Sequence, residues 1–501
     1  MAGFGDVTRI LTALTAVRRH WIFAIALCLG LAIRVIAMIG FPPAIWFGGD
    51  SASYLSTALR HAPGTSRLSG YGVMLMVLRP FRSFTLVVGV QHLLGLAVAV
   101  MIYAVARRYR LPAWGAALAA LPVLFDAYQI QLEHEILPSV PFGFLVMAAV
   151  TLIVWWRRDR PAWATVTAGV LLAVSATIWP VGLPLLLLYV LYLLLRRTGW
   201  RAFAVTVVAA AVPLGGYLFW FNSAYGEFAF SNSDGIYLWS RTMTFANCAV
   251  IRPPASEAGL CPHRPLTGRP AASSFIWIPD TPLNNLPRPK FSARNNSLAM
   301  NFALRAISAQ PGGYARAVAG NVAKSFTWNR PAYPSHLITN RYEFRYATKP
   351  TVPPGLVVIP GYTLASLQRA YGGVTTTRAV QPFSGFLIGY QRYVYLRGTL
   401  LGVILLIGLA GVVRSWRRGG IRRLADWGGP GLFPWAATVA LLIVPVLTAD
   451  FDPRYVLISM PAACLAGALA FARPAAADRP AGEPAGAVSS RPAAPGATAR
   501  R

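Results

Sequence analysis

Acidic residues are scarce in this chain. Only 16 of its 501 residues are Asp or Glu, against 46 Lys or Arg, so the formal net charge is +30 at pH 7. Charged residues make up 12% of the sequence and hydrophobic residues 55%. A soluble protein of this length would carry about twice that charged fraction. The composition excludes an ordinary soluble fold and makes each carboxylate a candidate functional group.

Lysine is nearly absent as well, with only Lys290, Lys324 and Lys349 in the chain. The positive charge comes from arginines in short clusters between apolar runs, which is typical of cytoplasmic loops under the positive-inside rule. We therefore predict no nucleic-acid partner. The clusters are Arg18-Arg19, Arg107-Arg108-Arg110, Arg157-Arg158-Arg160, Arg196-Arg197-Arg201 and Arg414 to Arg423.

Cysteine is also rare, and the zinc motifs HExxH and CxxC are missing, which argues against a zincin or a structural zinc site. Cys28 and Cys464 lie inside apolar runs and are interpreted as packing residues. Cys248 and Cys261 lie in a polar segment expected outside the cell, where a disulfide is compatible with the compartment. We predict that these two are bonded.

Long apolar runs are abundant, and their lengths suit helices that cross a bilayer. We predict an all-α polytopic membrane protein with about ten transmembrane helices and both termini in the cytoplasm. This alternation places every arginine cluster inside and most carboxylates outside. The helices are expected near 21–40, 84–106, 111–128, 137–156, 163–180, 182–196, 202–222, 394–413, 432–449 and 454–472.

The loop lengths divide the chain into four parts. Residues 1–222 form an N-terminal membrane module of seven helices with a long first external loop, 41–83. Residues 223–393 are too many for a structureless loop, and we expect an extracytoplasmic mixed cap domain with a helix near 298–326. Residues 394–472 form a three-helix membrane part. The tail 473–501, rich in Ala, Pro and Arg, is expected to be disordered in the cytoplasm.

The segment FGGDSASYL, residues 47–55, carries a lone carboxylate just beyond the first predicted helix. Asp50 at a membrane surface could act as a general base toward a substrate hydroxyl. It could equally be the N-cap of the helix that follows, because Asp is favoured there. The two interpretations are compatible.

Arg34 and the acidic turn at 133–135 are further candidates for the site, and each has a structural alternative. Arg34 lies within the first helix, where a charge usually marks function, although its side chain could snorkel to the outer interface. Glu133, His134 and Glu135 are consecutive in an external turn, so on a helix they would point in different directions. We expect Glu135 to face Asp50, with a solvated turn as the alternative.

The last external turn, TADFDPRYVLISMP, places Arg454 and Tyr455 at the mouth of the tenth helix. A guanidinium suits a phosphate group, because it offers several fixed donors and a permanent charge. The alternative is an interfacial anchor in which Arg454 pairs with Asp450 or Asp452. The three lysines are weaker phosphate candidates.

Together these segments resemble the GT-C superfamily of lipid-linked glycosyltransferases, in the branch of bacterial protein O-mannosyltransferase-like and lipid A aminoarabinose transferase-like enzymes. The order and spacing of the segments carry the resemblance, which covers most of the membrane part. Two positions depart from relatives: Ser51 follows Asp50 in place of a second acid, and Trp179 precedes Pro180 in place of Arg. The segments are Arg34, GGDSASYL with Asp50 and Tyr54, SGYGVML with Gly70 and Tyr71, VQHLLGLAVAVMIYAVARR with Gln91, EHEILPSVPF with Glu135, GVLLAVSATIWPVGLPLLLL, YLFWFNSAYGEFAFSNSDG, and DPRYVLISMP with Arg454 and Tyr455.

The resemblance implies an inverting glycosyltransferase in the bacterial plasma membrane that takes a sugar from a polyprenyl-phosphate donor on the extracytoplasmic face. Asp50 would be the base and Glu135 would support it. The acceptor hydroxyl could belong to a glycan, lipid or protein, and the sugar is not specified. A divalent metal ion is left open. Substrate-binding candidates are Arg34, Tyr54, Tyr71, Glu133, His134, Arg454 and Tyr455.

Two other function classes compete with this interpretation. A transporter or lipid flippase would need a polar path through the membrane centre, and Arg34 is the only deeply placed charge. The sequence also lacks an internal repeat, which weakens a transporter built on inverted repeats. A structural membrane protein that anchors an external domain would be indifferent to loss of Asp50.

Overall fold

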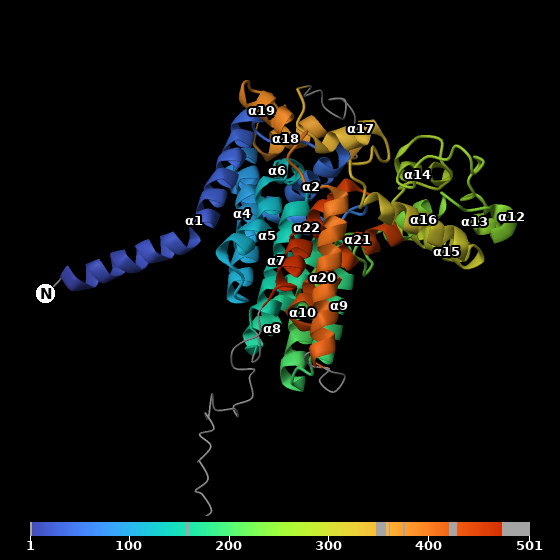
Figure 1. The fold of residues 1–501 in the computed structure, drawn as a ribbon. Coiled ribbons are helices and arrows are strands. Elements are labelled where there is room, and N and C mark those ends of the chain that lie inside the picture. The colour runs from blue at the N-terminus through green and yellow to red at the C-terminus, as the bar shows by residue number, and fades with distance from the viewer. Residues whose placement is uncertain are drawn as a thin grey trace, which may run out of the picture.

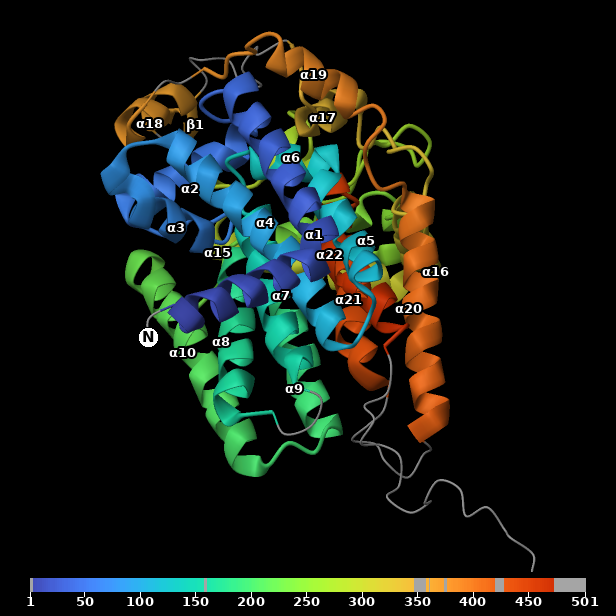
Figure 2. The same ribbon diagram turned by 60° about the vertical axis from the view of Figure 1, so that its left-hand side comes forward.

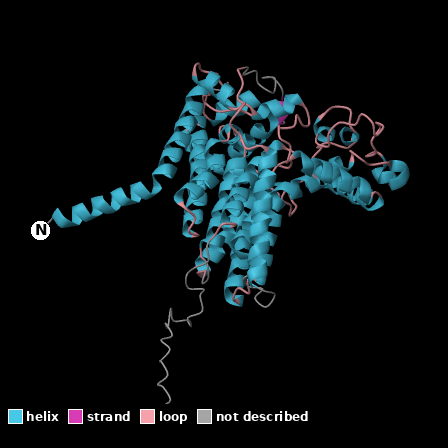
Figure 3. Ribbon diagram, in the orientation of Figure 1, coloured by secondary structure: helices cyan, strands magenta, loops and turns pink. Residues whose placement is uncertain are grey.

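The computed structural model describes residues 3–156, 160–346, 357–359, 361–373, 376–419 and 428–472. The predicted disordered tail, 473–501, lies outside these residues. The described chain is all-α apart from one short antiparallel pair, β1 (Val357–Ile359) and β2 (Tyr362–Thr363) (Figure 3).

Each of the ten predicted membrane segments coincides with a helix (Figures 1 and 2). The first helix begins earlier than predicted and extends beyond the bundle (Figure 1). The ten helices are α1 (Gly3–Gly40), α4 (Phe84–Arg108), α5 (Ala113–Phe125), α7 (Ser139–Trp155), α8 (Ala162–Ile178), α9 (Gly182–Leu195), α10 (Trp200–Tyr225), α20 (Gly398–Gly419), α21 (Leu432–Thr448) and α22 (Pro453–Leu469).

Five of these helices are long and apolar enough to cross a membrane, and a bent pair makes up to six among the described residues. The others are shorter apolar helices of 14 to 17 residues. The chain is a multi-pass membrane protein, and a total of ten crossings stays a prediction. The loop between α9 and α10 lies at the opposite end of the bundle from α2, α6 and α17 to α19 (Figure 1).

The bent pair corrects the predicted helix at 111–128. The structure ends α5 at Phe125 and starts α6 (Ala127–Glu133) at an angle of 56°. Asp126 causes the break, because its extended backbone and its side chain cap the new helix through the N–H groups of Tyr128 and Gln129. Its second oxygen accepts from Leu396 N–H at 2.7 Å. The bend carries residues 133–135 under the outer surface.

The end of the bundle that carries α2, which we call the outer end, is covered by short helices from distant parts of the chain (Figure 1). Tyr371 of α18 donates to Leu75 O of α3, and Thr377 donates to Ala44 O. These contacts close the outer end over the start of α2. The covering helices are α2 (Gly48–Arg60), α3 (Gly70–Leu78), α17 (His336–Thr339), α18 (Leu364–Tyr371) and α19 (Phe383–Tyr390), with 3₁₀ turns at Arg79–Phe81 and Asn340–Tyr342.

Part of the long external segment forms a lobe beside the bundle (Figure 1). Its own core is built around Trp239, Phe275 and Phe302. The predicted helix near 298–326 is two helices, since Pro311 begins the second of them. The lobe contains α11 (Asp234–Thr242), α12 (Cys248–Ile251), α13 (Ala255–Ala258), α14 (Ser274–Trp277), a 3₁₀ turn at Pro282–Asn285, α15 (Ala293–Ala309) and α16 (Pro311–Lys324).

A disulfide stabilises the lobe internally, and a buried aspartate links it to the bundle. The predicted disulfide between Cys248 and Cys261 is present and packs against the lobe core. Asp450, in the turn between α21 and α22, joins the lobe to the bundle: its carboxylate accepts hydrogen bonds from Ser273 N–H, Asn321 Nδ2 and Tyr333 Oη. By contrast, Tyr342, Leu364 and Tyr371 pack in the main core. The predicted cap domain at 223–393 is thus divided between a lobe and a cover on the bundle.

Candidate active site

Asp50 lies in the first turn of α2 and does not cap it. The N-cap residue is Phe47, so the capping interpretation of Asp50 is wrong. Its Oδ1 accepts a hydrogen bond from Arg67 Nη2 at 2.6 Å, and Arg454 Nη1 lies 3.6 Å from its Oδ2. The backbone there is held by Ser51, whose hydroxyl accepts from Phe47 N–H and donates to Ile136 O.

The electrostatic surroundings keep Asp50 ionised. Burial by itself raises the pKa of this carboxyl, but the positive charges of Arg67 and Arg454, together with the Arg67 hydrogen bond, outweigh burial and lower the pKa. The residue is only 8% exposed. A buried carboxylate is therefore maintained in its charged form by guanidinium groups from two distant parts of the chain.

Arg454 connects Asp50 to a second carboxylate. Its Nη2 lies 2.9 Å from Asp452 Oδ2, and Tyr342 donates to that same oxygen at 2.9 Å. The anchoring pair with Asp452 is therefore present, and Arg454 also approaches Asp50. The guanidinium also lies 5.2 to 5.5 Å from the ring centres of Phe47, Trp179 and Tyr342. These rings shield it from water and strengthen its interactions with anions.

Arg341 adds a third guanidinium, 5.5 Å from the ring centre of Phe47 and close enough to act on the charge of Asp50. We call Asp50, Arg67, Arg341, Asp452 and Arg454 the outer charge cluster. It has three cationic and two anionic side chains, so one positive charge is left over. Such a cluster can accept one further anionic group.

Glu135 is buried beside this cluster. The backbone around it pairs with the segment before α2, because Ile45 N–H donates to His134 O and Ile136 N–H donates to Ile45 O. Neither carboxyl oxygen of Glu135 has a hydrogen-bond partner in the described part of the chain. Burial raises the pKa of Glu135 well above its ordinary value, although Arg454 opposes the shift. Burial therefore favours the protonated form of Glu135, which can donate a hydrogen bond.

Glu133 and His134 belong to a different network in the interior. Glu133 pairs with Arg34 at 2.7 Å and with His92 Nδ1 at 2.9 Å. The ring nitrogens of His92 and His134 lie 3.1 Å apart, and His134 Nε2 is 2.9 Å from Phe41 O. Gly95 of α4 leaves the room, since a Cβ there would lie 2.0 Å from Glu133 Oε1.

Arg34 lies in the interior of the bundle and not beside Asp50. Its guanidinium is fully buried and engaged by Glu133 and by the carbonyls of Gly30, Leu124 and Val123. A charge in the bundle interior needs such partners, and neither snorkelling nor substrate binding describes this side chain. The substrate-binding interpretation of Arg34, Glu133 and His134 is not supported by their positions.

The predicted tyrosines surround the site at different depths. Tyr54 of α2 packs edge-on against Tyr71 with ring centres 5.2 Å apart, and its pKa is raised by burial and by Asp50. Tyr71 donates to Gln91 Oε1, and Gln91 Nε2 in turn donates to the carbonyls of Glu133 and Glu135. Tyr71 is thus a support for the turn. Tyr455 packs against Trp179 at 5.7 Å.

Sequence reasoning missed four functional neighbours: Arg67, Arg341, Tyr342 and His92. Arg67 had a usable signal, since it lies in the external loop that was assigned to the site. Tyr342 and Arg341 had none, because they return to the cluster from nearly 300 positions further along the chain. The predicted lysines do not reach it: Lys290 donates to Ile276 O and Lys324 to Gly320 O. Lys349 lies outside the described residues.

The sequence did not decide whether a divalent metal ion is needed, and the residues around Asp50 do not fit one. Within the described residues, no group of three or more His, Cys, Asp or Glu side chains is arranged to hold a metal ion. Asp50 and Asp452 are both bound by arginine, and burial favours the protonated form of Glu135, which is a poor metal ligand. We derive no step that passes through a metal.

No family model and no curated protein matches the chain. Among solved structures, the oligosaccharyltransferase of Archaeoglobus fulgidus, in complex with Zn and sulfate, is similar over 90% of this chain with 12% identity and a TM-score of 0.40. ArnT from Cupriavidus metallidurans, bound to undecaprenyl phosphate, is similar over 88% of this chain and 77% of its own, with 13% identity and a TM-score of 0.35.

This chain spans about half the length of the oligosaccharyltransferase, 48%. At such identities and TM-scores we base the functional proposal on the geometry of the outer charge cluster and not on these two proteins.

Proposed function

We propose that the protein is an integral-membrane inverting glycosyltransferase. It moves a sugar from a polyprenyl-phosphate donor to a hydroxyl acceptor on the extracytoplasmic face. The observation that carries the proposal is the contact of an ionised Asp50 with Arg67 and Arg454 in a buried cluster of excess positive charge. A base and a phosphate-binding group must lie this close if one displacement is to use both.

In the proposed reaction the acceptor oxygen attacks the anomeric carbon while its proton passes to Asp50. The bond between the anomeric carbon and the phosphate oxygen breaks, and the polyprenyl phosphate leaves with the electron pair. Arg454 and Arg67 would neutralise the leaving phosphate, which is already a good leaving group. The protein's contribution is therefore positioning and charge stabilisation.

The cluster also suggests how a weakly basic carboxylate becomes effective. Without donor, Arg67 and Arg454 hold the pKa of Asp50 below its ordinary value. A bound phosphate would compete for the same guanidinium groups, because they are bidentate donors suited to it. Asp50 would then lose part of its stabilisation and become a stronger base. Glu135, whose protonated form is favoured by burial, would donate a hydrogen bond to the acceptor.

The test is release of polyprenyl phosphate by the purified full-length protein in lipid nanodiscs, with a panel of polyprenyl-phosphate sugars and short oligosaccharide acceptors. The proposal expects release with at least one donor and inversion at the anomeric carbon. Movement of intact donor across the bilayer without release would instead indicate a flippase. A flippase needs a polar path through the membrane centre. Arg34, the deep charge that could have marked such a path, is paired with Glu133, which disfavours this alternative.

A further inference from the structure

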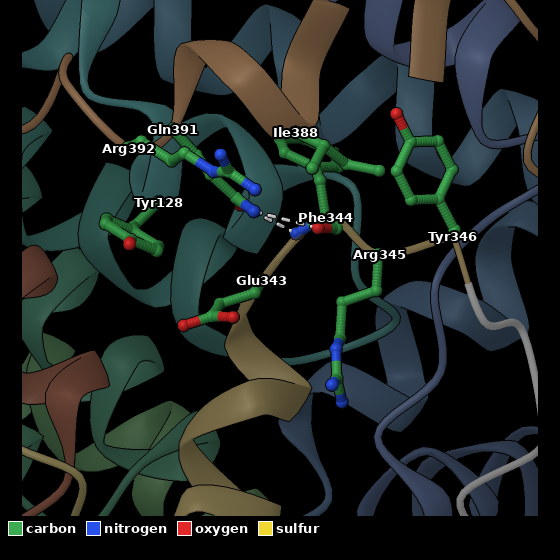
Figure 4. Close-up of a pocket in the computed structure, with 8 residues that line it drawn as sticks. All are labelled: Tyr128, Glu343, Phe344, Arg345, Tyr346, Ile388, Gln391 and Arg392. Atoms are coloured by element: carbon green, nitrogen blue, oxygen red, sulfur yellow. Dashed lines mark hydrogen bonds between the residues drawn. The ribbon is translucent and has the colours of Figure 1, made fainter. Parts of the chain in front are cut away.

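A cavity of about 410 Å³ lies at the outer end of the molecule (Figure 4). Its walls come from the segment after the 3₁₀ turn at Asn340–Tyr342, from the end of α19 and from Tyr128 of α6. The volume falls within the range of about 300 to 1,000 Å³ that is usual for small-molecule sites. Nothing in the proposed chemistry at Asp50 uses this cavity.

The cavity has a fixed wall. Gln391 forms two hydrogen bonds with the backbone of Phe344: its Nε2 donates to the carbonyl and its Oε1 accepts from the N–H, both at 2.8 Å (Figure 4). The ring of Phe344 stacks on Phe41 with centres 5.0 Å apart. The wall is therefore pre-organised, which reduces the entropy lost when a ligand binds.

The cavity also carries polar side chains that the protein itself leaves unused. Glu343, Arg345 and Arg392 line it, and within the described part of the chain none of these three side chains has a hydrogen bond or an ion pair. Tyr346 adds an aromatic ring that is 59% exposed. In Figure 4 these side chains surround the hollow from different sides. The cavity thus combines aromatic surface with free donors and a free acceptor.

The cavity and the outer charge cluster share one stretch of backbone, since Arg341 of the cluster lies two positions before Glu343 of the cavity. Tyr342, whose hydroxyl contacts Asp452 and whose ring faces Arg454, is followed directly by Glu343 and Phe344. Consecutive Cα atoms lie about 3.8 Å apart. The backbone that lines the cavity therefore continues directly into the residue that contacts Asp452.

We infer that this cavity is an acceptor subsite that binds a sugar ring of a carbohydrate acceptor, an inference that rests on the proposed glycosyltransferase function. A sugar has an apolar ring face for Tyr346 and Phe344, and hydroxyl groups that both donate and accept. Glu343 accepts from such hydroxyls, and Arg345 and Arg392 donate to them. The subsite holds a ring away from the reacting hydroxyl and selects a glycan over a simple alcohol.

The same residues disfavour the other ligands of such an enzyme. Among the residues that the structure describes, the carboxylate of Glu343 is not bound by an arginine, whereas both carboxylates of the outer charge cluster are, so a lipid phosphate is better placed at the outer charge cluster. An acyl or prenyl chain would have to strip water from three unpaired charged side chains, which is costly.

The experiment measures binding of the purified full-length protein to an array of defined oligosaccharides of mannose, galactose, glucose and arabinose. Wild-type protein is expected to bind at least one. Glu343→Gln and Arg392→Ala each weaken that binding by about tenfold or more, as expected for loss of a hydrogen bond to a charged group. Arg316→Ala is the matched control, since Arg316 is an exposed arginine of α16 away from the cavity. It leaves binding unchanged.

Asp50→Asn separates this inference from the proposed function, because it removes the base and leaves the cavity intact. It is expected to bind the same oligosaccharide as wild type while failing to release polyprenyl phosphate. In a transfer assay, Arg392→Ala raises the acceptor KM with little change in kcat or in donor KM. The inference is overturned if wild type binds no member of the array, if both cavity variants bind normally, or if they lose affinity for polyprenyl phosphate instead.

Discussion

Arg34 and Glu133 form a buried ion pair, and we predict that each is needed for stability and not for donor binding. Arg34→Met removes two hydrogen bonds to Glu133, at 2.7 and 2.8 Å, and leaves a carboxylate in the interior with only His92 and Gln129 as partners. Removing one member of a buried pair costs about 3 to 5 kcal/mol. Both side chains are essentially inaccessible, at 1% and 0% exposure, so solvent offers little compensation.

The assay is a double-mutant cycle on the purified protein, with the free energy of unfolding measured in mixed micelles. Glu133→Gln alone is also destabilising, because it leaves the guanidinium of Arg34 without its counter-ion. The combined variant Arg34→Met/Glu133→Gln should be less destabilised than the sum of the single variants, since no unpaired charge remains. If Arg34→Met kept wild-type stability but lost affinity for a polyprenyl phosphate, the structural assignment of Arg34 would be refuted.

Three further predictions concern the outer end. Asp450→Ala removes the hydrogen-bond acceptor of Ser273 and Asn321 and should lower the free energy of unfolding by on the order of 2 to 4 kcal/mol. Hydrogen exchange should become faster where the lobe meets the bundle, and unchanged exchange would contradict the role of Asp450. In the pH profile of kcat/KM, which reports the free enzyme, the acidic pKa should lie below the ordinary carboxyl value of about 3.9. It should rise in Arg67→Met, because burial then raises the pKa of Asp50 without the charge of Arg67 to lower it. An unchanged acidic pKa would exclude Asp50 as the titrating group. Because the folded-state pKa of Glu135 is raised, the wild-type protein should lose stability as pH rises from the unfolded pKa of about 4.3 towards the folded value. Glu135→Gln should not show this loss, so an identical pH dependence of the unfolding midpoint in both proteins would argue against a raised pKa of Glu135.

The helices of the bundle could be predicted because each apolar run is bounded by charged or turn-forming residues. Two boundaries were missed for local reasons. Asp126 could be recognised as a break only once its cap to α6 and its bond to Leu396 were known. The break at Pro311 had a visible signal, since proline starts a helix readily and seldom continues one.

The approach of Arg454 to Asp50 could be predicted from chemistry, because a base and a leaving phosphate must act on one carbon. The other contacts depend on tertiary packing. Arg34 looks like a lone charge in its own helix, and its partner Glu133 is 99 positions away in a turn held by Gln91. Nothing in the local sequence shows that Gly95 makes space for that carboxylate. Glu133 and Glu135 point into different surroundings, as the sequence predicted. The network of Arg34 and His92 that binds Glu133 could not be predicted from the sequence.

The central claim is that Asp50 accepts the acceptor's proton, and the most direct measurement is polyprenyl-phosphate release by Asp50→Asn beside wild type on the same donor and acceptor. Asparagine keeps the shape of the side chain but cannot take the proton. The account predicts release slower by about 100- to 10,000-fold, with the protein still folded and still binding donor. Wild-type turnover in Asp50→Asn would contradict the account and transfer the base role to another residue.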